Sequence, residues 1–167
     1  MGCRNGCDQG PAYAPKIAIG TTLASYAPSS PSSPDLNIPT DSTGKAAGAV
    51  AFALSQLGKP YMVGPGRFGP TYYDCSGLMV AAYKAVGIHI SDITYTQVAD
   101  GRAIPVDPQY VQPGDLLFFR GDVPVADFGH VAMAISATEE VEAPHTGDVV
   151  KRVPIPWDKV QAIRRIV

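Results

Sequence analysis

The sequence predicts an α+β fold in which helices pack on an antiparallel sheet, and three observations lead to it. The chain has 167 residues, of which 46% are hydrophobic and 17% charged, and this suits one domain with a buried core. Apolar residues recur at helical spacing in the first part of the domain and alternate at strand spacing in the second. Helices followed by a run of strands are typical of the α+β class.

A change in composition near residue 43 divides the chain. Residues 28–34 read Pro-Ser-Ser-Pro-Ser-Ser-Pro and Pro39 follows, so this stretch suits neither a helix nor a central strand. We therefore expect residues 1–42 to be a tail with an extended linker, and residues 43–167 to form the folded domain.

Hydropathy, cysteine content and net charge argue against several classes of protein. Residues 1–10 are polar and glycine-rich, without the apolar stretch of a secretory signal peptide, and no apolar run approaches the ~20 residues of a membrane-spanning helix. Cys3 and Cys7 are too few ligands for a zinc site; a disulfide, a bond to another chain and no role are the alternatives. The net charge of −2 argues against a protein that binds nucleic acid by neutralising phosphates.

The domain is expected to open with a helix. Asp41, Ser42 or Thr43 can cap its start, and Gly58 stands where a helix commonly ends. A loop rich in glycine and proline follows. The apolar face of this helix is expected to consist of Ala46, Val50, Leu54 and Leu57.

A second helix fits residues 75–86. Asp74 is a suitable N-cap, and Gly87 ends the helix. A short helical turn is expected around residues 94–99, where Gln97 is a packing or surface residue. The buried face of the second helix is expected to consist of Leu78, Met79, Ala82 and Val86.

The remaining sequence favours strands. Residues 115–120 follow a Pro-Gly turn at residues 113–114, and residues 130–136 alternate between larger and smaller apolar side chains. The basic pair at residues 164–165 is expected on a solvated strand face. Shorter strand candidates are residues 141–143, 149–153 and 162–167.

Residues 74–78 read Asp-Cys-Ser-Gly-Leu and carry the clearest chemical signal. They place Cys75 in the first turn of a predicted helix, where unpaired N–H groups and the helix dipole favour an anion such as a thiolate. The same N–H groups can hold a tetrahedral oxyanion, and the small Ser76 and Gly77 let a substrate carbonyl approach. Cys75 is therefore the predicted nucleophile, and a buried structural thiol is the alternative reading.

A cysteine nucleophile needs a base, and His130 is the best candidate. It follows Gly129 and begins the clearest predicted strand, so its imidazole stands at a strand end. Glu142 lies twelve residues further on, across an expected hairpin, where it can orient the imidazole. His145, in a predicted turn, is the alternative third member, and His89 is interpreted as structural.

These segments together resemble the NlpC/P60 family of cysteine peptidases. Besides residues 74–78, the matching segments are Gly-His-Val at 129–131, Glu-Ala-Pro at 142–144, Lys-Pro-Tyr at 59–61 and Pro-Gly-Asp-Leu at 113–116. The resemblance spans the whole predicted domain. It implies a papain-like NlpC/P60 fold, with N-terminal helices packed on a five- to six-stranded antiparallel sheet.

Carried over by position, the resemblance makes Cys75 the nucleophile and His130 the base. The third position of the family, most often histidine, falls on Glu142. A carboxylate there is expected to accept the Nδ1 proton of the imidazole and to stabilise the imidazolium.

The resemblance also implies which residues surround the nucleophile. Tyr61 matches a tyrosine that lines the family's site near the nucleophile, and its hydroxyl can help to hold the oxyanion. Asp74 and Ser76 match positions associated with the substrate. Met62 stands where an aromatic often occurs, and this changes one wall of the pocket.

The function that the resemblance implies is peptidoglycan hydrolysis. A cysteine endopeptidase would cleave stem peptides, with the bond between D-Glu and meso-diaminopimelate as the expected target, without a metal or organic cofactor. The alternatives are an amidase or acyltransferase on the same Cys–His pair and a non-catalytic wall-binding module. We expect a monomer that acts outside the cytoplasm on the cell wall, either secreted or delivered by a phage.

Overall fold

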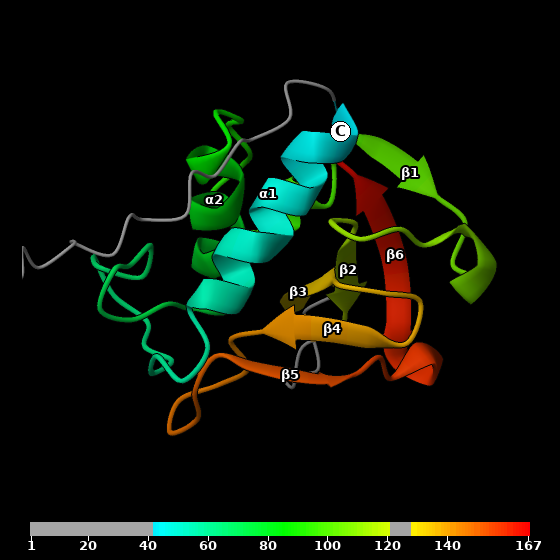
Figure 1. Cartoon of the computed structure of the whole chain (residues 1–167). Coiled ribbons are helices and arrows are strands. Elements are labelled where there is room, and N and C mark those ends of the chain that lie inside the picture. Colours follow the sequence, from blue (N-terminus) through cyan, green and yellow to red (C-terminus); the bar gives the residue numbers. More distant parts are fainter. Residues whose placement is uncertain (1–41, 121–127) are drawn as a thin grey trace, which may run out of the picture. The chain divides into compact units, whose positions relative to one another are not determined.

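A computed structural model describes residues 42–120 and 128–167 of the chain (Figure 1). The expected tail and linker, with Cys3 and Cys7, lie outside the described residues except for Ser42.

The first helix, α1 (Ser42–Ser55), packs against the second with small residues. Ala49 and Ala53 are fully buried, whereas Leu57, expected on the buried face, is 44% exposed. The expected face, which also held Ala46, Val50 and Leu54, was therefore wrong in part: these three are only partly buried. Alanine lets two helix backbones approach closely, so the alanines take the contact and the larger side chains flank it.

Helix α2 (Cys75–Ala85) confirms the predicted second helix. Asp74 caps it, accepting a hydrogen bond from the backbone N–H of Gly77 at 2.6 Å. Gly87, in the left-handed region with φ of 76°, ends the segment. The predicted face of Leu78, Met79, Ala82 and Val86 is buried. A single short helix, α3 (Thr94–Gln97), follows where a helical turn was expected.

Six strands form one sheet in the order β1-β6-β2-β3-β4-β5, and every neighbouring pair is antiparallel. The predicted antiparallel sheet is confirmed. Strand β1 was not expected, because a three-residue strand shows no alternation that could be recognised. The bounds are β1 (Arg102–Ile104), β2 (Leu116–Phe119), β3 (His130–Ala134), β4 (Glu139–Glu142), β5 (Lys151–Pro154) and β6 (Val160–Arg165).

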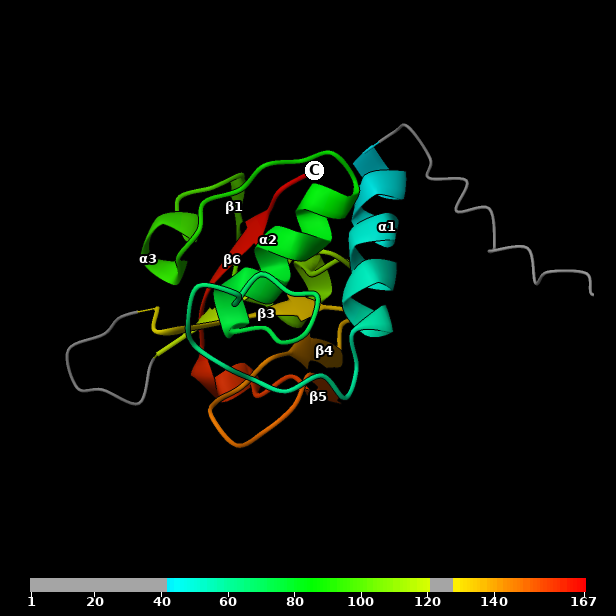
Figure 2. The ribbon, with the colours of Figure 1, turned by 90° about the vertical axis from the view of Figure 1, so that its left-hand side faces the viewer.

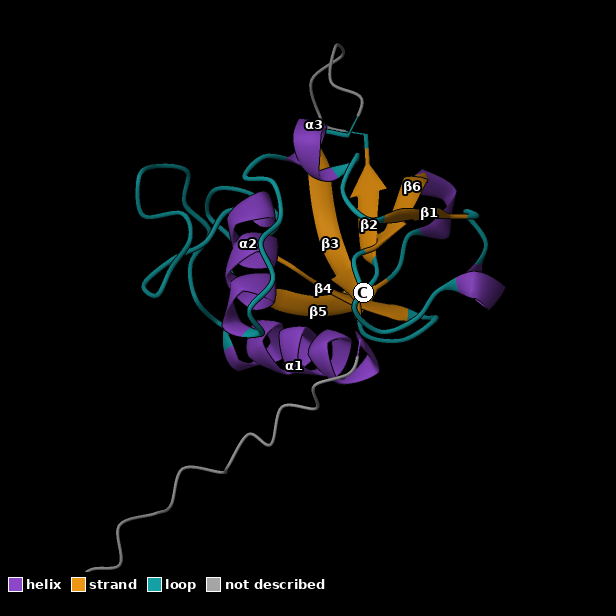
Figure 3. Ribbon diagram, turned by 90° about the horizontal axis from the view of Figure 1, so that it is seen from above, coloured by secondary structure: helices purple, strands orange, loops and turns teal. Residues whose placement is uncertain are grey.

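Both faces of the central strands are buried. In β3, Val131 and Met133 pack with α1 and α2, whereas Ala132 and Ala134 pack in a second cluster with Ile163. In Figure 3, α1 and α2 run at a steep angle to each other, with α2 next to β3. A strand covered on both faces reads as continuously apolar, and this is why β2 has the sequence Leu-Leu-Phe-Phe.

No helix in the described part of the chain is long and apolar enough to cross a membrane.

Candidate active site

Cys75 is the first residue of α2, and its thiol is free and 9% exposed. Figure 2 shows the loop between α1 and α2 winding past the start of α2. The chain approaches so closely that a Cβ added to Gly77 would lie 2.1 Å from the carbonyl oxygen of Arg67. Glycine at this position therefore lets the loop close over the first turn that carries the thiol.

Arg67 fixes that loop to the start of α2. Its Nη1 lies 3.0 Å from both carboxylate oxygens of Asp74 and donates to the hydroxyl of Ser76 at 2.7 Å. Its Nη2 donates to the backbone carbonyl of Asp92 at 2.6 Å. Sequence reasoning missed Arg67, and the available signal was a cation within the Gly/Pro-rich loop, seven residues before the capping aspartate.

Asp74 and Ser76 are buried, 7% and 4% exposed, and their side chains are engaged with Arg67. They are not among the residues that line the groove containing Cys75. The geometry therefore gives them a part in holding the nucleophile's helix, and their expected contact with substrate stays a prediction.

The structure brings His130 and Glu142 together. His130 begins β3 and Glu142 ends β4, and the two strands pair antiparallel, with Met133 opposite Val141. The Nε2 of His130 donates to the carboxylate of Glu142 at 2.8 Å. The ring of Phe119, on the neighbouring strand β2, lies 5.7 Å from the imidazole between centroids and limits its rotation.

The nitrogen that faces Glu142 differs from the expected one. Sequence reasoning assigned the Nδ1 proton to the carboxylate, but the structure pairs Glu142 with Nε2. The side chain of Cys75 also acts on the imidazole of His130 and raises its pKa. Since Nε2 is engaged, Nδ1 is the nitrogen left for the thiol. The pairing follows from the antiparallel β3 and β4, which bring Glu142 to Nε2 of the ring.

The surroundings of His130 favour the imidazolium. Burial acts to lower its pKa, but the hydrogen bonds with Cys75 and Glu142 and their charges outweigh burial and raise the pKa from 6.5 to about 9. At neutral pH both nitrogens of the imidazole therefore carry a proton.

Tyr61 stands at the wall of the same groove. Burial, followed by the nearby Cys75 and Asp74, raises the pKa of its phenol to about 12. The hydroxyl therefore keeps its proton at neutral pH and is a hydrogen-bond donor close to Cys75.

The groove around these residues encloses about 610 Å³ and is lined by side chains from both the helical and the sheet parts. His145 is at its rim and is largely exposed; its Nδ1 lies 3.1 Å from the carbonyl oxygen of Thr146, and its Nε2 lies 3.7 Å from Asp148. Between the two candidates for the third position, Glu142 is the one that contacts the imidazole.

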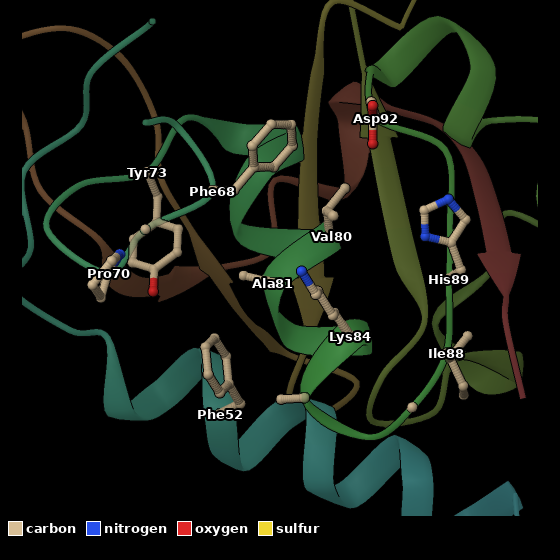
Figure 4. Close-up of a pocket in the computed structure, with 13 residues that line it drawn as sticks. Phe52, Phe68, Pro70, Tyr73, Val80, Ala81, Lys84, Ile88, His89 and Asp92 are labelled. Carbon is tan, nitrogen blue, oxygen red and sulfur yellow. The ribbon is translucent and has the colours of Figure 1, made fainter. Parts of the chain in front are cut away.

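A second hollow lies beside α1 and α2 (Figure 4). Phe52 projects into it from α1 and Lys84 from α2, and the exposed His89 stands at its edge. None of the predicted catalytic or substrate-binding residues lines this hollow. Among the described residues, the predicted catalytic residues Cys75, His130 and Glu142 line the groove around Cys75 and not this hollow.

The curated proteins that this chain resembles include peptidases. The sequence profile of the NlpC/P60 family matches residues 58–162. The peptidoglycan endopeptidase RipA of Mycolicibacterium smegmatis is 33% identical over 113 residues, covering 61% of this chain and 22% of that protein. A gamma-D-glutamyl-L-lysine dipeptidyl-peptidase of Bacillus cereus is 35% identical over 100 residues, covering 59% and 28%. The chain thus spans about a quarter of the length of these relatives.

Solved structures have the same fold. An NlpC/P60 family protein from Bacillus cereus superposes with a TM-score of 0.65 at 29% identity, covering 77% of this chain and 41% of that chain. The peptidoglycan hydrolase RipB from Mycobacterium tuberculosis superposes with a TM-score of 0.65 at 25% identity, covering 78% and 69%. The α+β, papain-like architecture expected from the sequence is confirmed. From its matching profile, its relatives and its fold, this chain belongs to the NlpC/P60 family.

Proposed function

We propose that this chain is a peptidoglycan hydrolase, a cysteine endopeptidase that cleaves stem peptides in the groove around Cys75. The observation that carries the proposal is the imidazole of His130, which lines one groove with Cys75 and is hydrogen-bonded to Glu142. A nucleophile, a base and an orienting carboxylate in this order are the parts that acyl transfer through a thioester needs.

The first half of the reaction forms the acyl-enzyme. At neutral pH the imidazole of His130 already holds the thiol proton, so the sulfur of Cys75 attacks the amide carbon of the substrate as a thiolate paired with the imidazolium. The negative charge on the carbonyl oxygen is stabilised by N–H groups at the start of α2 and by the hydroxyl of Tyr61. The imidazolium then gives its proton to the leaving amine, the C–N bond breaks, and a thioester remains on Cys75.

The second half releases the acyl group. His130, now neutral, accepts a proton from water, and the hydroxide attacks the thioester carbon. The C–S bond breaks, the thiolate pairs again with the imidazolium, and the free carboxyl product departs. Glu142 keeps Nε2 protonated and holds the ring in place through both halves. The residues that do this need no cofactor.

We assign the scissile bond to the amide between D-glutamate and the following diamino acid, with meso-diaminopimelate as the expected residue. Two kinds of support exist: the family resemblance of the catalytic segments and the relative named as a gamma-D-glutamyl-L-lysine dipeptidyl-peptidase. The catalytic domain is assigned to residues 43–167, with the cell wall outside the cytoplasm as its place of action.

The test is mass spectrometry of fragments released from diaminopimelate-type peptidoglycan by the full chain. We expect products that end in a free D-glutamate α- and γ-carboxyl together with peptides that begin with diaminopimelate. Cys75→Ala should lower the rate by at least about 10³-fold, since the nucleophile is lost. His89→Ala, in the separate hollow, is the control and should act like the wild type.

Two results would contradict the proposal. Full lysis by Cys75→Ala would remove the nucleophile assignment. Release of intact stem peptides from the glycan would instead identify an amidase acting on the bond to muramic acid.

A further inference from the structure

Glu140 is a buried carboxyl that the mechanism above does not use. It lies in β4 and is 2% exposed, and its Oε2 is buried without a hydrogen-bond partner among the described residues. An apolar side chain would fill such a position at lower cost, because an unpaired buried polar atom costs free energy. A buried acid of this kind in a catalytic groove is a candidate for a functional role.

The position of Glu140 connects it to the catalytic residues. It is two residues from Glu142 on one strand, so both side chains point to the same face of the sheet. Its neighbours in register are Ala134 on β3 and Val153 on β5, whose side chains offer neither charge nor a hydrogen bond. Glu140 also lines the groove that contains Cys75. A second carboxyl thus stands beside the His130–Glu142 pair.

Two carboxylates in one poorly hydrated site do not both ionise readily, and one of them keeps its proton. Glu142 has the imidazole of His130 as its partner, whereas Oε2 of Glu140 has no hydrogen-bond partner in the described part of the chain. Burial, followed by the charge of Glu142, raises the pKa of Glu140 to about 8, although the charge of His130 acts to lower it. Glu140 is therefore the member of the pair that is neutral at pH 7.

Other charges surround this pair. The strand β5 places Lys151 opposite Glu142, where it is bonded to Asp148. The remaining titratable or charged groups along the groove are Cys75 on α2, Tyr61, Tyr95, Arg120, His145 and Lys159.

We propose that Glu140 is a positioning residue of the catalytic centre that acts through His130. At neutral pH it holds a proton, so that the site contains a single carboxylate. As the pH rises it releases that proton to solvent, and its new negative charge keeps the imidazole protonated to higher pH. This inference rests on the proposed cysteine-peptidase mechanism, in which the imidazolium must give a proton to the leaving amine.

The proposal predicts a shift in the alkaline limb of activity. In Glu140→Gln, a neutral side chain of the same shape, the pH at which kcat/KM falls to half should move down by about 0.5 to 1 unit. Glu140→Met should give the same shift, and Glu140→Asp should recover part of it because it keeps a carboxyl. Glu139→Gln is the matched control: the same change, one residue away, on a side chain that faces the other way and pairs with Arg152.

The second readout does not depend on substrate. The NMR resonances of the His130 ring, titrated in the full chain, should give a lower imidazole pKa in Glu140→Gln and Glu140→Met than in the wild type and in Glu139→Gln. A shift in this titration together with absent cleavage of stem peptides would support the role of Glu140 and reject the proposed substrate. Equal His130 titrations in the wild type, the three Glu140 variants and Glu139→Gln would overturn the proposal, even where the Glu140 variants differ in stability.

Discussion

The proposed chemistry depends on the imidazole of His130, because Glu142 and Phe119 fix its ring in the groove that contains Cys75. Nε2 is held by Glu142, and the ring packs near Phe119. A ring fixed in this way presents its other nitrogen to Cys75 in one orientation and one tautomer. The orientation is therefore set before substrate enters, and no reorganisation is needed in the reaction.

Replacing the carboxylate of Glu142 should show that it acts through the ring. In Glu142→Gln, kcat should fall by about 10²- to 10⁴-fold, since an amide neither fixes the tautomer nor stabilises the imidazolium. His145→Ala should lower kcat by less than about threefold, because His145 does not contact the imidazole. Steady-state kinetics on a stem peptide measure both, and the reverse order of effects would assign the third position to His145.

The raised pKa of His130 has a definite consequence for pH. The folded-state value of about 9 exceeds the ordinary 6.5, so the stability that His130 contributes is fully present below about pH 6.5 and is lost as the pH rises through about 9. The imidazolium needed for the leaving amine is lost over the same range. We expect kcat/KM to fall with a midpoint near pH 9, and the stability advantage of the wild type over His130→Gln to narrow between pH 6.5 and 9. A midpoint near pH 6.5 in both measurements would contradict the assignment.

Among the secondary-structure elements, α2 bears the nucleophile and depends on its first turn. Asp74 has two tasks there: it caps the backbone N–H of Gly77 and it pairs with Arg67, which also reaches Ser76. The pair is largely buried, with side chains 15% and 11% exposed. The loop and the helix start are thus joined by charge-assisted hydrogen bonds, which are stronger than neutral ones.

A double-mutant cycle separates these two tasks of Asp74. Asp74→Asn keeps an oxygen for the cap and removes the charge, and Arg67→Met removes the cation. We expect a coupling energy of about 1 to 3 kcal/mol between them from urea unfolding. Asp74→Ala should cost about 1 kcal/mol more than Asp74→Asn through the lost cap. Additive effects of Asp74→Asn and Arg67→Met would mean that the pair does not stabilise the helix start.

Across the described domain, the groove exists because three remote segments meet. Helix α2 contributes Cys75, β3 contributes His130 and β4 contributes Glu142. The central sheet holds β3 and β4 in register between two apolar clusters, so the relative position of base and carboxylate is fixed by packing on both faces. The rigidity of the site is thus a property of the sheet rather than of a loop.

The end of the chain is tied to the sheet by a buried ion pair. Arg165 in β6 donates from Nε and Nη2 to Asp115, which precedes β2 and is 1% exposed. Sequence reasoning placed this arginine on a solvated face, and that expectation was wrong. The reason is that its partner is 50 residues away in the chain and becomes a neighbour only when β2 and β6 pair.

Removing this arginine should destabilise the whole domain. Arg165→Met leaves the carboxylate of Asp115 buried without its cation, although the backbone N–H of Gln112 still donates to it, at a cost of about 3 to 5 kcal/mol in the free energy of unfolding. Arg152→Met is the control, since its pair with Glu139 is about half exposed and is worth less than about 1 kcal/mol. Chemical denaturation measures the free energy of unfolding of both variants. Similar losses in the two would mean that the buried pair stabilises the domain no more than the exposed one.

Local sequence pattern was sufficient to predict helix α2 and much of the candidate site. Helix α2, its Asp74 cap and the positions of Cys75 and His130 at the start of their elements follow from periodicity and from residue types whose preferences act within a few positions. Glu142 was expected within a strand at residues 141–143, and it stands at the end of β4. The alanine face of α1, the choice of Nε2 by Glu142 and the burial of Glu140 beside it were decided only by tertiary packing. Each depends on which side chains from distant segments surround a group, and the exclusion of water by those segments fixes contact, charge state and orientation. The expected strand at residues 141–143 did not include Glu140; only the observed strand β4 puts Glu140 and Glu142 on one face, with Ala134 on β3 and Val153 on β5 as apolar neighbours of Glu140.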